Sequence, residues 1–180
     1  CTMSEDAHGN LFVPSDQGLA VVSPRGVRHL DASVGFPGDT VLTSVTVRDG
    51  SLWVGTFGRG LVRPLGRGEW LSWRREDGLA HNSVWAVLRT SDQRVWVGTT
   101  GGLDVIGADD RVERVLSGEQ DGAYVLLETG EHEVVALSSS GLTRLDLEGR
   151  VLSRLDRKTT FDDDRIDGMA LAPDGRLWVV

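Results

Sequence analysis

The phrase Gly50-Ser51-Leu52-Trp53-Val54 returns in related form along almost the whole chain. The related phrases are Gly9-Asn10-Leu11-Phe12-Val13, Gln93-Arg94-Val95-Trp96-Val97, Glu131-His132-Glu133-Val134-Val135 and Gly175-Arg176-Leu177-Trp178-Val179. Their apolar anchors stand at positions 12, 53, 96, 135 and 178, so the steps between them are 41, 43, 39 and 43 residues. A period of ~40–45 residues with four short strands in each unit is typical of the blades of a β-propeller.

The spacing inside each unit predicts the strands. Val84–Leu88 is apolar at every position, which is typical of an inner strand covered on both faces. A second strand at 95–99, a third at 103–106 and a half-exposed outer strand at 112–115 follow it. A Gly-Leu pair marks the third strand of four units: Gly18-Leu19, Gly60-Leu61, Gly102-Leu103 and Gly141-Leu142.

These spacings predict an all-β fold, a partial β-propeller of about four four-stranded antiparallel blades with incomplete first and last blades. We expect residues 1–180 to form a single fragment of such a propeller. Its units lie at approximately 1–31, 32–73, 74–116, 117–155 and 156–180.

Composition narrows the function classes. The formal net charge of −8 argues against nucleic-acid binding, which needs clustered Lys and Arg. No segment reaches the ~18 apolar residues of a membrane-spanning helix, so no membrane contact is expected within this segment. Cys1 is the only cysteine, which excludes an internal disulfide. Cys1 is either a lipidated first residue or a point where a longer chain is cut, and the repeat register favours the cut.

Two stretches of the third unit resemble the two-component regulator propeller repeat. They are Asp77-Gly78-Leu79-Ala80-His81-Asn82-Ser83-Val84-Trp85-Ala86-Val87 and Arg94-Val95-Trp96-Val97-Gly98-Thr99-Thr100-Gly101-Gly102-Leu103. The second unit resembles the same repeat through Asp49–Thr56 and Gly60-Leu61. In the first and fourth units, Pro14-Ser15 and Leu137-Ser138 stand where the repeat has Gly-Thr.

The resemblance implies a sensor. Propellers of this family are typically periplasmic or extracellular input modules of bacterial receptors with a membrane helix and a histidine kinase or cyclase output. They bind a small molecule or a glycan and signal by rearranging a homodimer. We therefore expect a non-catalytic ligand-sensing propeller without a cofactor. A propeller enzyme of the metal-dependent lactonase-like or lyase-like kind is one alternative, and a secreted binding scaffold is another.

Propeller topology also predicts where a ligand binds. The connections from an outer strand to the next inner strand, and from a second to a third strand, gather at one mouth of the channel. A polar rim around such a mouth is the usual small-molecule site on this fold. The candidate ligand-binding residues on these connections are Asp16, Arg59, His81, Asn82, Asp121 and Asp164. For His81 and Asn82, capping of the loop backbone is the alternative role.

Neither a metal site nor a catalytic residue is expected. The acidic run Asp162–Asp167 lacks the Asp-x-Asp-x-Asp-Gly spacing and the distal Glu of a calcium loop. The four histidines share no repeated spacing, which argues against zinc. Trp70 and Trp73 lie three residues apart on an expected outer strand and so on opposite faces, where core packing is the expected role of each.

Overall fold

The computed structural model describes residues 2–37, 40–46, 51–66, 68–130, 132–161, 166 and 168–180. Four antiparallel sheets of four strands follow one another along the chain, and a two-stranded sheet comes last. Sheet 1 consists of β1 (Ser4–Glu5), β2 (Leu11–Ser15), β3 (Gly18–Ser23) and β4 (Gly26–Leu30). Sheet 2 consists of β5 (Val41–Thr46), β6 (Leu52–Thr56), β7 (Leu61–Gly66) and β8 (Glu69–Trp73).

Sheet 3 consists of β9 (Val84–Arg89), β10 (Val95–Thr99), β11 (Gly102–Ile106) and β12 (Val112–Ser117). Sheet 4 consists of β13 (Ala123–Glu128), β14 (Glu133–Ser138), β15 (Gly141–Asp146) and β16 (Val151–Asp156). The last hairpin consists of β17 (Met169–Leu171) and β18 (Leu177–Val179). Short helices lie between the sheets: η1 (Ala32–Val34), η2 (Arg75–Asp77), η3 (Glu119–Asp121) and α1 (Arg157–Thr160).

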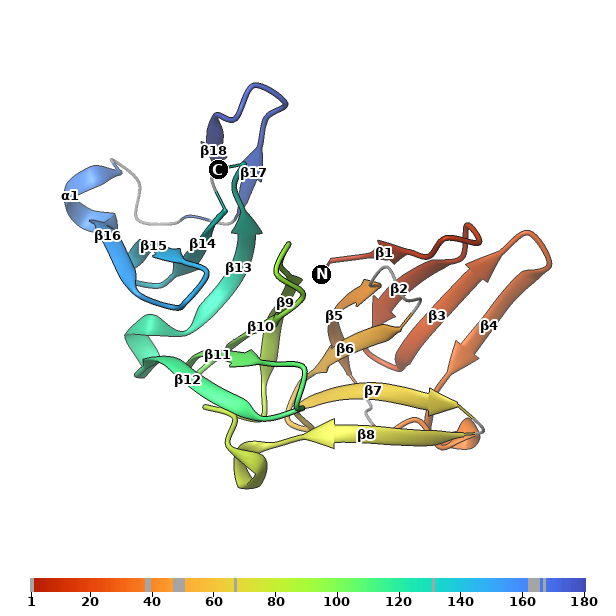
Figure 1. Cartoon of the computed structure of the whole chain (residues 1–180). Coiled ribbons are helices and arrows are strands. Elements are labelled where there is room, and N and C mark those ends of the chain that lie inside the picture. The colour runs from red at the N-terminus through yellow and green to blue at the C-terminus, as the bar shows by residue number, and fades with distance from the viewer. Residues whose placement is uncertain are drawn as a thin grey trace.

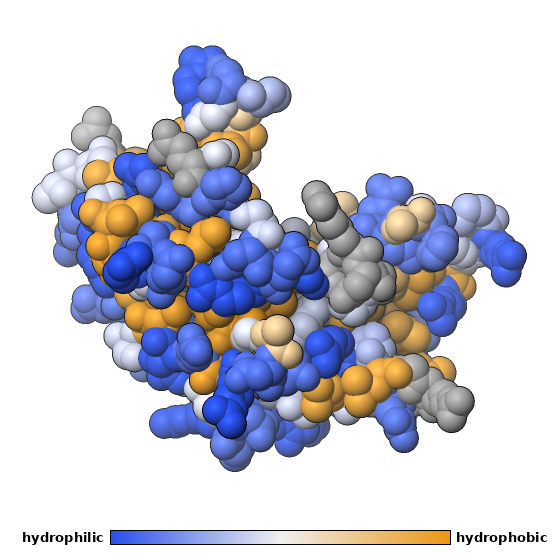
Figure 2. Space-filling model, in the orientation of Figure 1, coloured by the Kyte–Doolittle hydropathy of each residue, from blue (hydrophilic) through white to orange (hydrophobic). Residues whose placement is uncertain are grey.

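The sheets succeed one another along an arc, as Figure 1 shows, with β1, β5, β9, β13 and β17 on its concave side and β4, β8, β12 and β16 on its convex side. The space-filling view shows the concave side hollowed between the hairpin β17–β18 and sheet 1 (Figure 2). This arrangement confirms the predicted partial propeller. The predicted strands of sheet 3 begin and end within two residues of the observed ones. The inner strand of sheet 1 is reduced to the two residues of β1.

Each pair of neighbouring sheets shares an apolar core, and the repeated anchors lie in these cores. Phe12 lies in the core between sheets 1 and 2, and Trp53 in the core between sheets 2 and 3. Trp96 is fully buried between sheets 3 and 4. Val135, which takes the place of the aromatic anchor in sheet 4, packs toward the last hairpin together with Leu137 and Met169. The anchors thus join each sheet to the element that follows it.

The Gly-Leu pair recurs because the end of the outer strand crosses it closely. A Cβ atom on Gly102 would lie 2.1 Å from the carbonyl oxygen of Leu116, and Gly102 has a φ of +145°. The glycines of the Gly-Leu pairs in sheets 1, 2 and 4 also have a positive φ and also lie too close to a carbonyl oxygen for a Cβ atom. The residue that ends the second strand closes this turn, since Thr99 Oγ1 donates to the Gly102 carbonyl at 3.1 Å. Ser15 and Ser138 donate in the same way to Gly18 and Gly141, so serine replaces threonine without loss of the contact.

The two tryptophans of β8 pack on opposite faces of sheet 2, as their spacing predicts. Trp70 meets Phe36 edge to face, with ring centroids 5.0 Å apart, beside the core shared with sheet 1. Trp73 stacks on Trp53 at 4.9 Å in the core shared with sheet 3. Its indole Nε1 donates to the Asp110 carbonyl across the sheet boundary at 2.9 Å. Both tryptophans therefore hold neighbouring sheets together.

Candidate functional site

Three inner strands carry a β-bulge at the same place, the second residue of the strand. In sheet 3 the ladder pairs Thr99 with Val84 and Gly98 with Ala86, so that Trp85 is left between them. The same register shift leaves Leu42 unpaired in sheet 2 and Tyr124 unpaired in sheet 4. A bulge redirects the side chain of the extra residue, and bulges are frequent beside functional sites.

The bulges in sheets 3 and 4 display aromatic side chains. Trp85 meets Phe57, in the turn after β6, with ring centroids 6.2 Å apart and an interplanar angle of 75°. It meets Tyr124 on its other side at 5.8 Å and 77°. Its indole Nε1 donates to Thr100 Oγ1 at 2.9 Å, which fixes the ring. Phe57 is 57% exposed and Tyr124 37% exposed. We call these three residues the aromatic row.

The row lies on the face predicted for ligand binding, which we call the bulge face. This face is formed by the loops that precede inner strands and by the turns between second and third strands. Backbone hydrogen bonds join the two kinds of connection, from Gly60 N to the Asn82 carbonyl at 2.8 Å and from Gly118 N to the Gly101 carbonyl at 3.0 Å. Connections that are separate in the sequence therefore form one continuous surface.

Three of the predicted residues are brought near one another on this face. Arg59 is exposed in the same turn as Phe57, and the contact between Gly60 and Asn82 joins that turn to the loop of His81. His81 Nδ1 accepts a hydrogen bond from Ser83 N at 3.0 Å, and Asn82 Oδ1 accepts one from Arg75 N at 2.7 Å. These are the loop-capping contacts named above as the alternative role. The Nε2 atom of His81 takes no part in this contact.

The other predicted residues lie apart from the row. Asp16 is exposed in a turn of sheet 1, and its carbonyl accepts a hydrogen bond from Thr40 Oγ1 at 3.5 Å. Asp121 accepts a hydrogen bond from Arg154 of β16 at 2.6 Å, toward the convex side of sheet 4. Asp164 lies outside the described residues. Of the run Asp162–Asp167, only Ile166 lies within the described residues.

A buried carboxylate fixes the loop between sheets 2 and 3. Asp104 of β11 has a side chain that is 0% exposed, and it pairs with Arg114 of β12. Its Oδ2 accepts a hydrogen bond from Ala80 N at 2.8 Å, and Arg114 donates to the Gly78 carbonyl at 2.7 Å. Burial raises the pKa of Asp104 above its ordinary value, although the hydrogen bonds from Ala80 and Arg114 oppose that change. The loop that leads to Trp85 is thus held by an ion pair whose carboxylate is buried and whose arginine is partly exposed.

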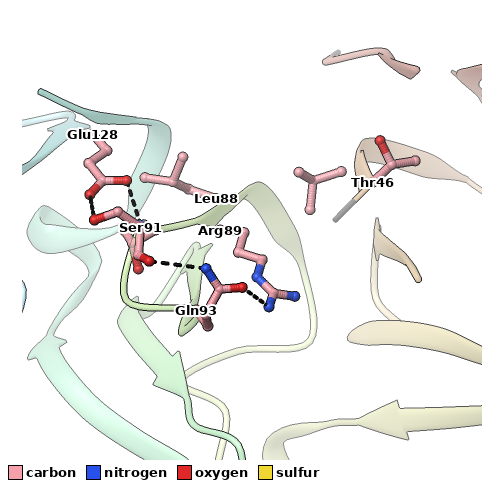
Figure 3. A pocket seen from close by; sticks show the side chains of 8 residues that line it. Thr46, Leu88, Arg89, Ser91, Gln93 and Glu128 are labelled. Atoms are coloured by element: carbon pink, nitrogen blue, oxygen red, sulfur yellow. Dashed lines mark hydrogen bonds between the residues drawn. The ribbon is translucent and has the colours of Figure 1, made fainter. Parts of the chain in front are cut away.

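The opposite end of the inner strands has a cavity of about 430 Å³. It is lined by Val45, Thr46, Leu88, Arg89, Thr90, Ser91, Gln93 and Glu128. Figure 3 shows Glu128 and Ser91 pointing toward one another, and Ser91 Oγ donates to Glu128 Oε1 at 2.5 Å. His132 Nδ1 lies 3.0 Å from the same Ser91 hydroxyl. Because the carboxylate bonds to serine directly and not to the far nitrogen of the histidine, these residues do not form a nucleophilic triad. They join the turns of sheets 3 and 4.

Within the described ranges, no group of three or more His, Cys, Asp or Glu side chains is arranged to hold a metal ion. The helices of the same part of the chain lack the length and the hydropathy of a membrane-spanning helix. The described part of the bulge face therefore presents aromatic rings, hydroxyls, an amide and an imidazole. Such groups bind a ligand by stacking and hydrogen bonding.

Sequence reasoning missed the aromatic row. The sequence predicts that Trp85 is covered as a member of the inner strand Val84–Leu88, whereas Trp85 is only half-buried and its neighbour Tyr124 is partly exposed. The available signal was the recurrence of an aromatic residue at the second position of two successive inner strands. An apolar run alone does not reveal a bulge, and so it does not show which side chain is redirected.

Residues 78–101 match the family model described as "Two component regulator propeller". The chain contains a two-component regulator propeller repeat. The match confirms the resemblance inferred from the sequence, and the repeat covers the loop of His81, the bulge at Trp85 and the Gly98-Thr99 turn. Among curated proteins, none matches the chain significantly.

Solved structures with a similar fold include two extracellular domains of proteins described as hybrid two component systems from B. thetaiotaomicron. The BT4673 domain superposes with a TM-score of 0.85 at 18% identity, over 99% of this chain and 25% of that one. For the BT3049 domain the TM-score is 0.80 at 15% identity, over 98% of this chain and 25% of that one. Virginiamycin B lyase from Staphylococcus aureus superposes with a TM-score of 0.77 at 11% identity, over 99% and 62% of the two chains. These likenesses show the fold, and this chain spans about a quarter of the two extracellular domains.

Proposed function

We propose that this chain is part of a non-catalytic, ligand-sensing propeller that forms the extracytoplasmic input region of a bacterial two-component-type receptor. The observation that carries the proposal is the aromatic row, displayed by aligned bulges on the bulge face. The match to the regulator propeller repeat and the likeness to two extracellular domains support the location and the signalling role.

The proposed ligand is a small molecule or a glycan with a flat, weakly polar face. Edge-to-face rings with exposed surfaces offer apolar area for stacking, and they lose little conformational entropy on binding. Arg59, His81 and Thr100 offer polar groups beside the rings. Binding would shift a pre-existing equilibrium of the receptor by its difference in affinity between two arrangements.

The test is calorimetric titration of the intact protein with a panel of soluble oligosaccharides and small aromatic metabolites. A compound that binds should lose about tenfold or more in affinity with Trp85→Ala, as expected for a tryptophan at the centre of a binding surface. Trp178→Ala is the matched control, because Trp178 is also an exposed tryptophan (57%) but lies on β18, away from the row. Equal effects of the two substitutions would contradict the proposed site.

A propeller enzyme of the lyase-like or lactonase-like kind remains the second candidate, since one superposed structure is a lyase. Mass spectrometry of the same panel of compounds after incubation with the protein, with and without added divalent cations, distinguishes an enzyme from a sensor. Compounds that bind and stay chemically unchanged support a sensor. A product that forms only with the protein present would replace the sensor by an enzyme.

A further inference from the structure

The outer strands of sheets 3 and 4 each send an arginine back to the loop that precedes their own sheet. Arg114 lies opposite Asp104 in the ladder of sheet 3, and Arg154 lies opposite Thr143 in the ladder of sheet 4. Asp104 and Thr143 both follow a Gly-Leu pair directly, so the two arginines occupy equivalent positions. We call Arg114 and Arg154 the loop arginines.

Each loop arginine holds a loop that leads straight into the aromatic row. Arg114 contacts the loop 74–83, which ends two residues before Trp85. Arg154 contacts the loop 118–122, which ends two residues before Tyr124. A shift of either loop therefore moves one end of the row, because only one paired residue separates the loop from the bulge.

The two loops are held in different ways. Arg114 uses two nitrogens for two groups, Nε for Asp104 and Nη2 for the Gly78 carbonyl, and the buried Asp104 also accepts from Ala80 N. Leu79 anchors the same loop in the core and is 1% exposed. Among the described residues, Arg154 makes one side-chain hydrogen bond, to Asp121 at 2.6 Å, and these two side chains are 46% and 21% exposed. In the other pair Arg114 is 38% exposed and Asp104 is 0% exposed. Neither η2 nor η3 contains a buried residue, so the difference between the loops lies in Leu79 and in the buried Asp104.

We propose that the loop arginines are positioning residues of the aromatic row, with Arg114 a permanent support and Arg154 a releasable one. Removal of Arg114 leaves the buried carboxylate of Asp104 without its counter-charge, whereas the pair of Arg154 with Asp121 is exposed and opens at little cost. The Trp85 end of the row is therefore fixed, and the Tyr124 end adjusts when a ligand enters. Only the statement that a ligand enters rests on the proposed function.

Amide hydrogen exchange on the intact protein tests the positioning role without a ligand. Arg154→Ala should raise exchange about two- to threefold in 118–122 and leave 74–83 unchanged. Arg114→Ala should raise exchange about tenfold or more in 74–83 and leave 118–122 unchanged, with the amide of Ala80 as the most sensitive site. If either substitution raises exchange in both loops alike, or in neither, the proposal fails.

Conservative variants keep the test valid if Arg114→Ala does not fold. Arg154→Lys should restore protection of its loop, since a single ammonium group replaces a single contact. Arg114→Lys should restore it only in part, because an ammonium group cannot serve both Asp104 and the Gly78 carbonyl in the fixed geometry of a guanidinium. Full rescue by lysine at both positions would show that the two supports are equivalent and would overturn the distinction between them.

The link from loop to row is read from fluorine NMR of fluorotryptophan-labelled protein, with the Trp85 signal assigned by Trp85→Phe. Arg114→Lys should shift or broaden that signal, and Arg154→Lys should leave it unchanged. An unchanged signal in both variants would separate the loops from the row and refute the positioning role. A failure to find any binding compound would instead contradict the proposed function and leave the exchange and NMR results standing.

Discussion

Sheets 3 and 4 have the same strand order, yet each meets the next element of the chain differently. Trp96 of sheet 3 is fully buried, and a Cβ atom on Gly98 would lie 2.4 Å from the Ala123 carbonyl of sheet 4. In sheet 4 the equivalent residues are Val135 and Leu137, both buried toward Met169 of the last hairpin. A large anchor thus goes with a close backbone approach, and a small anchor goes with a side chain that fills the wider gap. In these two sheets both positions differ together, whereas sheet 1 combines the large anchor Phe12 with Pro14 in place of the glycine.

The largest expected effect comes from removing the larger anchor. Trp96→Val should lower the free energy of unfolding by about 3 kcal/mol, because it leaves a cavity in a closely packed core. Val135→Ala should cost less, about 1.5 kcal/mol for two methyl groups. Urea denaturation of the intact protein measures both changes. Equal losses would mean that the two boundaries contribute alike, contrary to the difference in their cores.

The close approach at Gly98 gives the second effect. Gly98→Ala should destabilise the protein by about 2 kcal/mol, since the new methyl group meets backbone that must move. Gly130→Ala is the control: a Cβ atom there meets nothing within 4 Å, so a change within about 0.5 kcal/mol is expected. The midpoints of urea denaturation of the two variants measure the difference in stability between them. A Gly98→Ala variant as stable as Gly130→Ala would show that the sheet boundary yields easily.

The same sterics explain why so much of the fold could be predicted from the sequence. A neighbouring carbonyl oxygen excludes a side chain at Gly98 and at the glycines of the Gly-Leu pairs, and the side chains of Thr43 and Val84 exclude one at Gly55. The glycines therefore return at fixed positions and mark the strand ends. The candidate site was harder to predict from the sequence than the fold. The topology indicated the face of Arg59, His81 and Asn82, but the bulge at Trp85 depends on register with β10. The hydrogen bond between Arg154 and Asp121 joins residues 33 positions apart in the sequence, and no sequence motif predicts it.

The third effect is a difference in pH dependence between carboxylates of the two sheets. Burial raises the pKa of Asp104 in sheet 3. The stability that its protonated form contributes is present below the ordinary value and is lost as the pH rises through the raised pKa. In sheet 4, partial desolvation of Asp146 is outweighed by hydrogen bonds from the backbone and side chain of Arg150, so its pKa is lowered. The contribution of Asp146 is therefore present above the ordinary value and is lost as the pH falls through the lowered pKa.

Urea denaturation between about pH 3 and pH 7 measures this contrast. Relative to Asp104→Asn, the wild-type protein should lose stability as the pH rises. Relative to Asp146→Asn, it should gain stability over the same interval. Slopes of the same sign for the two carboxylates would contradict the assignment of one as buried and the other as hydrogen-bonded at the surface.

The smallest effect concerns salt. Asp121→Asn removes the exposed pair with Arg154 and should cost roughly 0.5 kcal/mol at low ionic strength. At about 0.5 M salt this difference in stability between Asp121→Asn and the wild-type protein should vanish, because dissolved ions screen the attraction between exposed charges. Asp104→Asn is the matched control, since its carboxylate is shielded from solvent and its effect should change little with salt. If salt reduced both effects equally, the carboxylates of Asp104 and Asp121 would be equally accessible to solvent. Sheets 3 and 4 would then differ in their anchors but not in the way they hold the loops of the aromatic row.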